Sequence, residues 1–225
     1  MTESTLHTAF INGVQEISLN RLERRNAVNP SLVVELHAAL QAAELDQDVG
    51  AVLVYGNGEH FRSGLDLKDP DVGSVALLWQ QLHRFIASMH TPLVIAHHGA
   101  AINAGAALAL SGDLLVSGET AFLQIMEARI GMTPPVNLAW LLYRHSRAVA
   151  TRLSLSCDRV TGHDLGALGL AYAIVPDDGV VERVRELAGQ IAEYPKRSGV
   201  MIKQLLNGPG ASFDEILDGL LQNTQ

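Results

Sequence analysis

Two glycine-containing corners carry the residues of this sequence whose types and spacing could perform chemistry. Ser63-Gly64-Leu65 follows the apolar segment Ala51–Tyr55, and Asn103-Ala104-Gly105 follows the segment Thr91–His98. If these segments are neighbouring parallel strands, both corners lie at one edge of a sheet. One backbone N–H from each corner can then point at the same oxygen, and glycine permits the unusual φ values and close approach that this needs. The corners therefore predict a main-chain oxyanion hole; two tight turns that serve only packing are the alternative.

Alternating strand and helix patterns predict the scaffold that positions these corners. Val14–Asn20 alternates apolar and polar residues as a strand does, and a helix is predicted from Pro30 with Asn29 as its N-cap. The nearly all-apolar strands before the corners fit a sheet that is covered on both faces. A second helix is predicted over Val75–Met89. Its buried side is expected to carry Leu78, Leu82, Phe85 and Met89.

The pattern changes after Asn137, where it is mostly helical with one further strand. Strands that alternate with helices, followed by a run of helices, predict the α/β class. We expect a core over residues 1–136 that carries the site and a helical region over residues 137–225.

Composition excludes several classes of function. The chain has 225 residues, 48% of them hydrophobic, and a net charge of −8 with only 16 Lys and Arg residues. A nucleic-acid partner is not expected, because it requires a basic surface. The single Cys157 allows no disulfide framework or cysteine metal cluster and fits a reducing compartment. We expect a cytoplasmic protein, because the start has no signal-peptide pattern and no charge-free apolar run reaches ~18 residues.

Five motifs in register over Val14–Pro176 resemble those of the crotonase superfamily, the enoyl-CoA hydratase/isomerase family. They are LNRLERRNAVNPSLVVELHAAL, VGAVLVYGNGEHFRSGLDL, TPLVIAHHGAAINAGAALALSGDLLVSG, EARIGMTP and HDLGALGLAYAIVP. The resemblance implies a ββα spiral core with a C-terminal helical region, which here is shorter than usual. It implies a homotrimer or hexamer whose contacts come from residues 137–225. It also implies an acyl-CoA thioester as substrate, as in fatty acid metabolism, with no metal and no cofactor other than the coenzyme A of the substrate.

The resemblance also assigns roles to individual residues. The N–H groups of Leu65 and Ala104 would form the oxyanion hole that stabilises a thioester enolate. The turn Arg24–Ala27 would lie beside the CoA phosphates and pantetheine, and Ser63–Asp66 would border the adenine and the thioester. The residues implied in substrate binding are Arg24, Arg25, Ala27, Ser63, Gly64, Asp66 and Asn103.

Four of these substrate-binding residues also have a purely structural interpretation. Arg24 and Arg25 can equally be a solvated pair at a turn, and Asp66 can cap the segment that follows it. Asn103 stands where the family usually has glycine, and capping of the next helix is the interpretation we favour for it, ahead of a ligand contact.

Glu127 is the catalytic carboxylate that the resemblance implies. The family's hydratases carry two glutamates; here one position holds Glu127 and the other holds Ala107. A 1,3-proton shift needs only one carboxylate, so an enoyl-CoA isomerase is the function we favour. The apolar neighbours of Glu127 predict a raised pKa for its carboxyl group. The alternative is a structural role only, as an exposed glutamate at a helix start or as the ion-pair partner of Arg129.

Two other functions stay open at this point. One is an enoyl-CoA hydratase, a lyase, in which another group replaces the missing glutamate. The other is a homologue that binds acyl-CoA without turnover. A thioester on an acyl carrier protein is a further possible substrate, because its pantetheine arm is the same as that of CoA.

Overall fold

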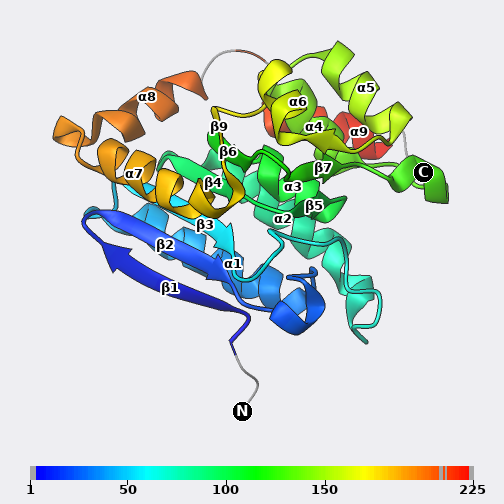
Figure 1. Cartoon of the computed structure of the whole chain (residues 1–225), viewed down its shortest axis with the longest axis horizontal. Coiled ribbons are helices and arrows are strands. Elements are labelled where there is room, and N and C mark those ends of the chain that lie inside the picture. The colour runs from blue at the N-terminus through cyan, green and yellow to red at the C-terminus, as the bar shows by residue number, and fades with distance from the viewer. Residues whose placement is uncertain (1–3, 208–209, 211, 223–225) are drawn as a thin grey trace.

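The computed structural model describes residues 4–207, 210 and 212–222, and its first feature is a β-hairpin at the edge of a sheet (Figure 1). Strands β1 (Leu6–Ile11) and β2 (Val14–Leu19) pair antiparallel. Asn12 and Gly13 close the hairpin with positive φ, as the tightest hairpin turns require. The sequence patterns predicted β2 but not β1. Five of the six β1 residues are exposed, so its sequence carries no burial pattern.

Parallel pairing extends this sheet to six strands in the order β1-β2-β3-β4-β6-β9. The four further strands are β3 (Ala51–Gly56), β4 (Leu93–His97), β6 (Leu114–Gly118) and β9 (Ala173–Val175). β3 and β4 are adjacent and parallel, with Val52 opposite Leu93. The two strands that precede the corners are therefore neighbours, as predicted.

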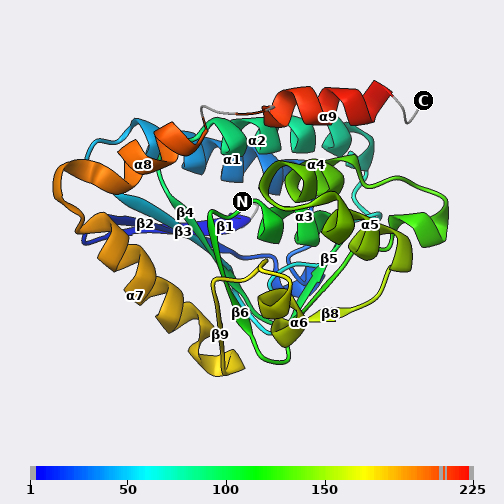
Figure 2. The ribbon, with the colours of Figure 1, turned by 90° about the horizontal axis from the view of Figure 1, so that it is seen from above.

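Helices cover both faces of the six-stranded sheet, as the edge-on view shows (Figure 2). The helices on one face are α1 (Pro30–Leu45), α2 (Val75–Ser88) and α3 (Ala104–Leu110). α7 (Val180–Ala192) covers the other face, where Val184 and Leu187 pack with Leu53 and Val94 in a separate apolar cluster. Burial on both faces explains why β3 and β4 are largely apolar.

The first two helices show how far local sequence decides structure. Asn29 caps α1, since its Oδ1 accepts a hydrogen bond from the Leu32 N–H at 3.0 Å, and Pro30 occupies the first helical position, as predicted. The predicted buried side of α2 was only partly right. Leu82 and Met89 are buried, but Leu78 and Phe85 are half-buried. The buried residues of α2 itself are Val75, Trp79, Leu82, His83, Ile86 and Ala87.

A second, three-stranded sheet and further helices complete the fold. The strands are β5 (Ala100–Ile102), β7 (Phe122–Gln124) and β8 (Val160–Thr161), in the order β5-β7-β8. The helices are α4 (Pro135–Arg144), α5 (Arg147–Ser156), α6 (Gly162–Ala167), α8 (Ser198–Leu206) and α9 (Phe213–Gln222). The short 3₁₀ turns are η1 (Leu22–Arg24), η2 (Val72–Ser74), η3 (Glu127–Ile130), η4 (Asp177–Gly179) and η5 (Pro195–Arg197).

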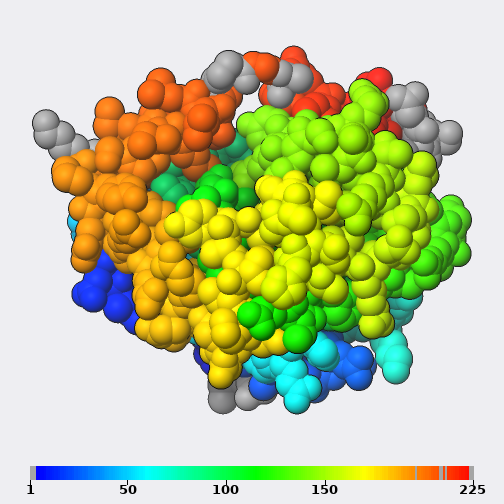
Figure 3. Space-filling model, turned by 45° about the horizontal axis from the view of Figure 1, so that its top comes forward, coloured from blue at the N-terminus to red at the C-terminus, as the bar shows by residue number. Residues whose placement is uncertain are grey.

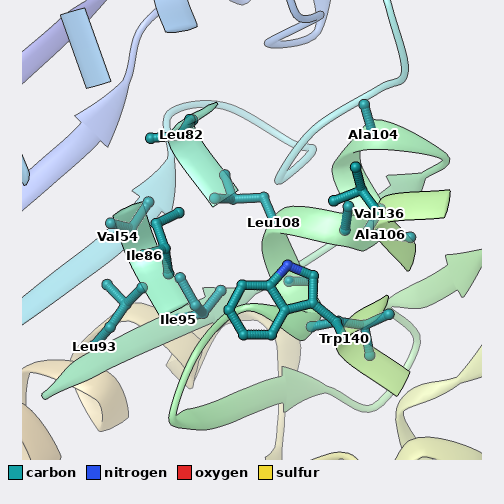
Figure 4. Close-up of a cluster of buried hydrophobic side chains, with 14 of the residues drawn as sticks. Val54, Leu82, Ile86, Leu93, Ile95, Ala104, Ala106, Leu108, Val136 and Trp140 are labelled. Atoms are coloured by element: carbon teal, nitrogen blue, oxygen red, sulfur yellow. The ribbon is translucent and has the colours of Figure 1, made fainter. Parts of the chain in front are cut away.

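Trp140 of α4 lies at the centre of the larger apolar core (Figure 4). Side chains of α2 and α3, among them Ile86 and Leu108, surround it in the close-up. The second half of the chain also contributes to the main sheet, since β9 pairs with β6 and α7 packs on it. The division at residue 136 and the trimer or hexamer stay predictions.

Candidate active site

The two corners lie side by side in the structure. Arg62 and Ala101 form a parallel bridge, in which the Arg62 N–H donates to the Ala100 carbonyl at 3.0 Å. The Arg62 carbonyl accepts from the Ile102 N–H at 3.3 Å. A methyl group built on Gly64 would lie 3.7 Å from the Asn103 Cβ. The first corner therefore runs alongside the second, although 38 positions separate the two in sequence.

The backbone around Leu65 is oriented by the turn that precedes α1. Val28 and Leu65 form a parallel bridge, whose hydrogen bonds run from the Val28 N–H to the Gly64 carbonyl (3.0 Å) and from the Asp66 N–H to the Val28 carbonyl (2.8 Å). Because these bonds use groups of residues 64 and 66, the N–H of Leu65 itself faces away from Val28. The N–H of Ala104 opens α3 and has no acceptor within that helix. Their convergence on one oxygen stays a prediction.

The turn at residues 24–27 is fastened to the first corner. The Ser63 N–H donates to the Arg25 carbonyl at 3.0 Å, and Arg24 and Arg25 are exposed. The Asp66 carboxylate is buried and forms an ion pair with Arg21 at 2.9 Å. Burial raises the pKa of Asp66, but Arg21 and the hydrogen bond from the Lys68 N–H lower it more, so the pKa lies below its usual value. Asp66 thus holds the turn and the corner together, and it also caps the following segment as the alternative interpretation expected.

Asn26 is a residue of this turn that the sequence reasoning missed. It is fully buried with a positive φ of 54°, and its amide Nδ2 donates to the Asn57 and His60 carbonyls at 3.0 and 3.1 Å. Its Oδ1 accepts from the Arg21 N–H at 2.9 Å. Neighbouring Ala27, assigned to substrate binding, is also buried, and its carbonyl accepts from Arg21 Nη1 at 2.5 Å. An asparagine directly after two arginines is the signal that could have indicated this left-handed turn.

Asn103 corrects two expectations about the second corner. Its side chain does not cap α3; instead Oδ1 accepts from the Met126 N–H at 2.8 Å, and its own N–H donates to the Gln124 carbonyl at 2.9 Å. The unusual backbone conformation also belongs to Asn103, with φ 51° and ψ −106°, and not to Gly64 or Gly105. Gly105 serves close approach, because a Cβ on it would lie 2.5 Å from the Arg62 carbonyl oxygen.

Glu127 directly follows the residue that Asn103 holds. Its carboxyl is half-buried, and this burial raises its pKa, as predicted. Oε1 accepts from Asn137 Nδ2 at 3.3 Å, whereas Oε2 is buried without a hydrogen-bond partner in the described part of the chain. Arg129 does not neutralise it, since the Arg129 guanidinium lies 3.5 Å from the Ser156 carbonyl. Two of its expected apolar neighbours, Ile130 and Met132, are instead 65% and 57% exposed.

Comparison with known proteins identifies the family of this chain. A family model described as enoyl-CoA hydratase/isomerase matches residues 9–214. The chain belongs to the enoyl-CoA hydratase/isomerase family. Two relatives from Escherichia coli (strain K12) are similar in sequence. They are 1,2-epoxyphenylacetyl-CoA isomerase, 31% identical over 87% of this chain and 79% of the relative, and 2,3-dehydroadipyl-CoA hydratase, 30% identical over 84% and 76%.

Solved structures of the enoyl-CoA hydratase/isomerase family share the fold. An enoyl-CoA hydratase from Mycobacterium avium subsp. paratuberculosis K-10 superposes with a TM-score of 0.86 at 25% identity, covering 98% of this chain and 87% of that one. The crotonase-type α/β fold implied by the sequence motifs is thereby confirmed. An enzyme activity of the hydratase/isomerase kind follows from the family.

Ala107 stands at the position where the motif resemblance implies the second glutamate of the family's hydratases. It is fully buried in α3, one helical turn after Ala104, within the apolar core.

Within the described residues no group of three or more His, Cys, Asp or Glu side chains could hold a metal ion. The same residues contain no helix that is long and apolar enough to cross a membrane.

A cavity of about 660 Å³ opens elsewhere, between α8 and α4, as the hollow between these segments in the space-filling view shows (Figure 3). Its walls include Asp113, Tyr143 and Lys203. None of the residues that the sequence assigned to the site lines it. We therefore place the candidate site of this family member at the two corners and not in the cavity.

Substitutions at Asn103 should separate its two structural roles. Asn103→Ala removes the acceptor of the Met126 N–H but keeps a side chain at positive φ, so we expect a loss of about 1 kcal/mol. Asn103→Gly removes the same acceptor but adopts this backbone freely, so it should be about 1–2 kcal/mol more stable than the alanine variant. Urea unfolding measures both. Equal stability of the two variants would contradict the strain assigned to this position.

Proposed function

We propose that this protein catalyses proton transfer at an acyl-CoA thioester, as an enoyl-CoA isomerase does, with Glu127 as the base. The observation that carries the proposal is the half-buried Glu127 carboxyl, whose pKa is raised and whose segment Asn103 fastens to the second corner. A raised pKa brings a carboxyl nearer to the range in which it can both take up and release a proton at neutral pH.

One carboxylate is sufficient for this reaction. Glu127 would take a proton from C2 or C4 of an enoyl thioester and return it at the other carbon. Between the two steps the negative charge would rest on the thioester oxygen, which the N–H groups of Leu65 and Ala104 would stabilise. Addition of water needs both a base for the water and an acid for the α-carbon, and buried Ala107 supplies neither.

Two assays run in parallel test this proposal. Isomerisation of a Δ3-enoyl-CoA and hydration of crotonyl-CoA are measured on the same preparation, with calorimetric binding of a saturated acyl-CoA as the reference. Isomerisation without comparable hydration is the expected result. Faster hydration would favour a hydratase instead, and tight binding without turnover would favour a non-catalytic homologue.

The exposed arginines of the turn give a second test, which concerns coenzyme A itself. Replacing Arg24 and Arg25 by alanine is expected to weaken binding of CoA several-fold at low salt and less at high salt, because screened surface charges provide the contact. Calorimetric titration at two ionic strengths measures this. The exposed pair Arg147 and Arg152 on α5, replaced in the same way, is the control. Unchanged affinity at low salt would show that neither arginine contacts coenzyme A, and the ion pair of Arg24 with Asp66 at 4.0 Å would then be purely structural.

A further inference from the structure

Arg62, two residues before Gly64, is a fully buried cation without an anionic partner in the described part of the chain. Its Nε, Nη1 and Nη2 atoms are all buried and make no hydrogen bond there. The guanidinium stacks on Trp79, with Cζ 4.5 Å from the ring centroid. Burial and the like charge of Arg21 lower its pKa to about 9, so that it still carries its charge at neutral pH. Stacking on the face of an aromatic ring compensates only part of the hydration free energy that a buried guanidinium loses.

His83 places a second unused donor beside the same ring. The imidazole lies edge-on to Trp79 with 4.3 Å between centroids, and its Nδ1 accepts from Trp140 Nε1 at 2.8 Å. An indole N–H can only donate, so the proton of the neutral imidazole is on Nε2. Burial and the charge of Arg62 hold the pKa of His83 well below its usual range, which keeps it neutral. Nε2 is buried and has no partner among the described residues.

These donors lie directly behind the candidate site. The Arg62 backbone pairs with Ala101 of the second corner, and its carbonyl is the group against which Gly105 packs. Trp140, which orients His83, is on the same helix as Asn137, the partner of Glu127. The Arg62 side chain leads from the first corner to Trp79 of α2, so a bound acyl group that follows it from the corners would approach both Arg62 and His83. Arg62 and His83 supply donors there without an acceptor.

We propose that the acyl group of the substrate ends in a carboxylate, which Arg62 and His83 bind. This inference rests on the proposed function, since it takes the thioester to lie at the corners. A guanidinium fork matches the two oxygens of a carboxylate, and the His83 N–H adds a third donor. An acyl group that ends in methyl would leave all of these donors buried and unsatisfied, which is costly for charged groups in particular. The chemical class of substrate is thus the mono-CoA thioester of a dicarboxylic acid.

Binding of saturated thioesters tests the proposal without relying on turnover. Calorimetry compares glutaryl-, adipyl- and pimeloyl-CoA with pentanoyl-, hexanoyl- and heptanoyl-CoA. We expect the carboxylate to strengthen binding about 10- to 100-fold for at least one chain length. The terminal methyl ester of that diacid thioester keeps the oxygens but not the charge, and it should bind like the methyl-ended compound. Equal affinities within every pair, or an ester that binds as tightly as the acid, would overturn the proposal.

Arg62→Met is the matched variant, because methionine keeps an unbranched apolar side chain beside Trp79. It should lose the preference for the carboxylate and bind the methyl-ended thioesters as before. Its melting temperature should be unchanged or higher, since replacing an unpaired buried charge by an apolar group is neutral or stabilising; an arginine with a purely structural role predicts the opposite. A variant that keeps the preference would overturn the proposal. If Arg62→Met does not fold, the comparison on the unmodified protein still decides.

The same titrations separate this inference from the function on which it rests. If methyl-ended thioesters bind and the carboxylates bind no better, only the dicarboxylic substrate is wrong. If no thioester and no CoA binds, the acyl-CoA function is wrong and the inference fails with it.

Discussion

Replacing Glu127 with glutamine is expected to lower turnover of an enoyl thioester by about 10²- to 10⁴-fold, the usual contribution of a general base. Binding of a saturated acyl-CoA should not change. The amide is nearly isosteric, and its oxygen can still accept from Asn137 Nδ2. Stability should not fall either, because burial disfavours the ionised carboxylate that the neutral amide replaces. Steady-state kinetics, calorimetry and urea unfolding measure these three quantities.

The pH profile gives the Glu127 experiment a second readout. The folded-state pKa of Glu127 is raised by burial, and the base acts in its ionised form. Activity should therefore fall as the pH is lowered through this raised pKa, and this acid limb should be missing from the residual activity of Glu127→Gln. Glu193→Gln, an exposed change after α7, is the control and should keep both rate and profile. Full activity of Glu127→Gln would place the base elsewhere.

Alanine at Gly105 is expected to damage the protein, whereas alanine at Gly64 should damage only binding. A Cβ at Gly105 would lie 2.5 Å from the Arg62 carbonyl oxygen, which is backbone and cannot move aside without shifting the first corner. We expect a loss of about 1–3 kcal/mol in unfolding free energy and loss of activity. At Gly64 the nearest atom is the Asn103 Cβ at 3.7 Å, an ordinary contact, and φ is not left-handed.

The Gly64→Ala methyl nevertheless projects toward Asn103, into the space between the corners where the thioester would sit. We expect unchanged stability and an affinity for acyl-CoA that is about ten-fold lower or worse. Gly189→Ala in α7, where no atom lies within 4 Å, is the control and should add about 0.5–1 kcal/mol of stability. Gly64→Ala that binds acyl-CoA normally would contradict the placement of the thioester.

Local signals explain the parts of the fold that the sequence predicted. Asn29 and Pro30 mark the start of α1 because a cap and a fixed φ act within one helical turn. The apolar β3 and β4 were recognisable because each is buried on both faces. β1 was missed because its residues are mostly exposed, and the buried side of α2 was partly wrong because His83, a polar residue, belongs to it.

The candidate site was predictable only as far as family motifs reach. They indicated Leu65, Ala104 and Glu127, and the structure places the first two on adjacent corners. The side chain of Asn103 accepts a hydrogen bond from the Met126 N–H, 23 positions later. No local sequence pattern predicts a hydrogen bond between residues so far apart in the chain. The sequence also could not show that the guanidinium of Arg62 lacks a hydrogen-bond partner, because this becomes evident only when the positions of all neighbouring residues are known.

The ion pair between Arg21 and Asp66, together with the bridge between Val28 and Leu65, gives the site a mechanical property. The turn that would hold the nucleotide end of coenzyme A and the corner that would hold the thioester are fastened to each other by these contacts, and we expect them to move together. Truncated thioesters that lack the nucleotide should for this reason react more slowly even when they saturate the protein, because the far end of the ligand helps to fix the position of the reacting end.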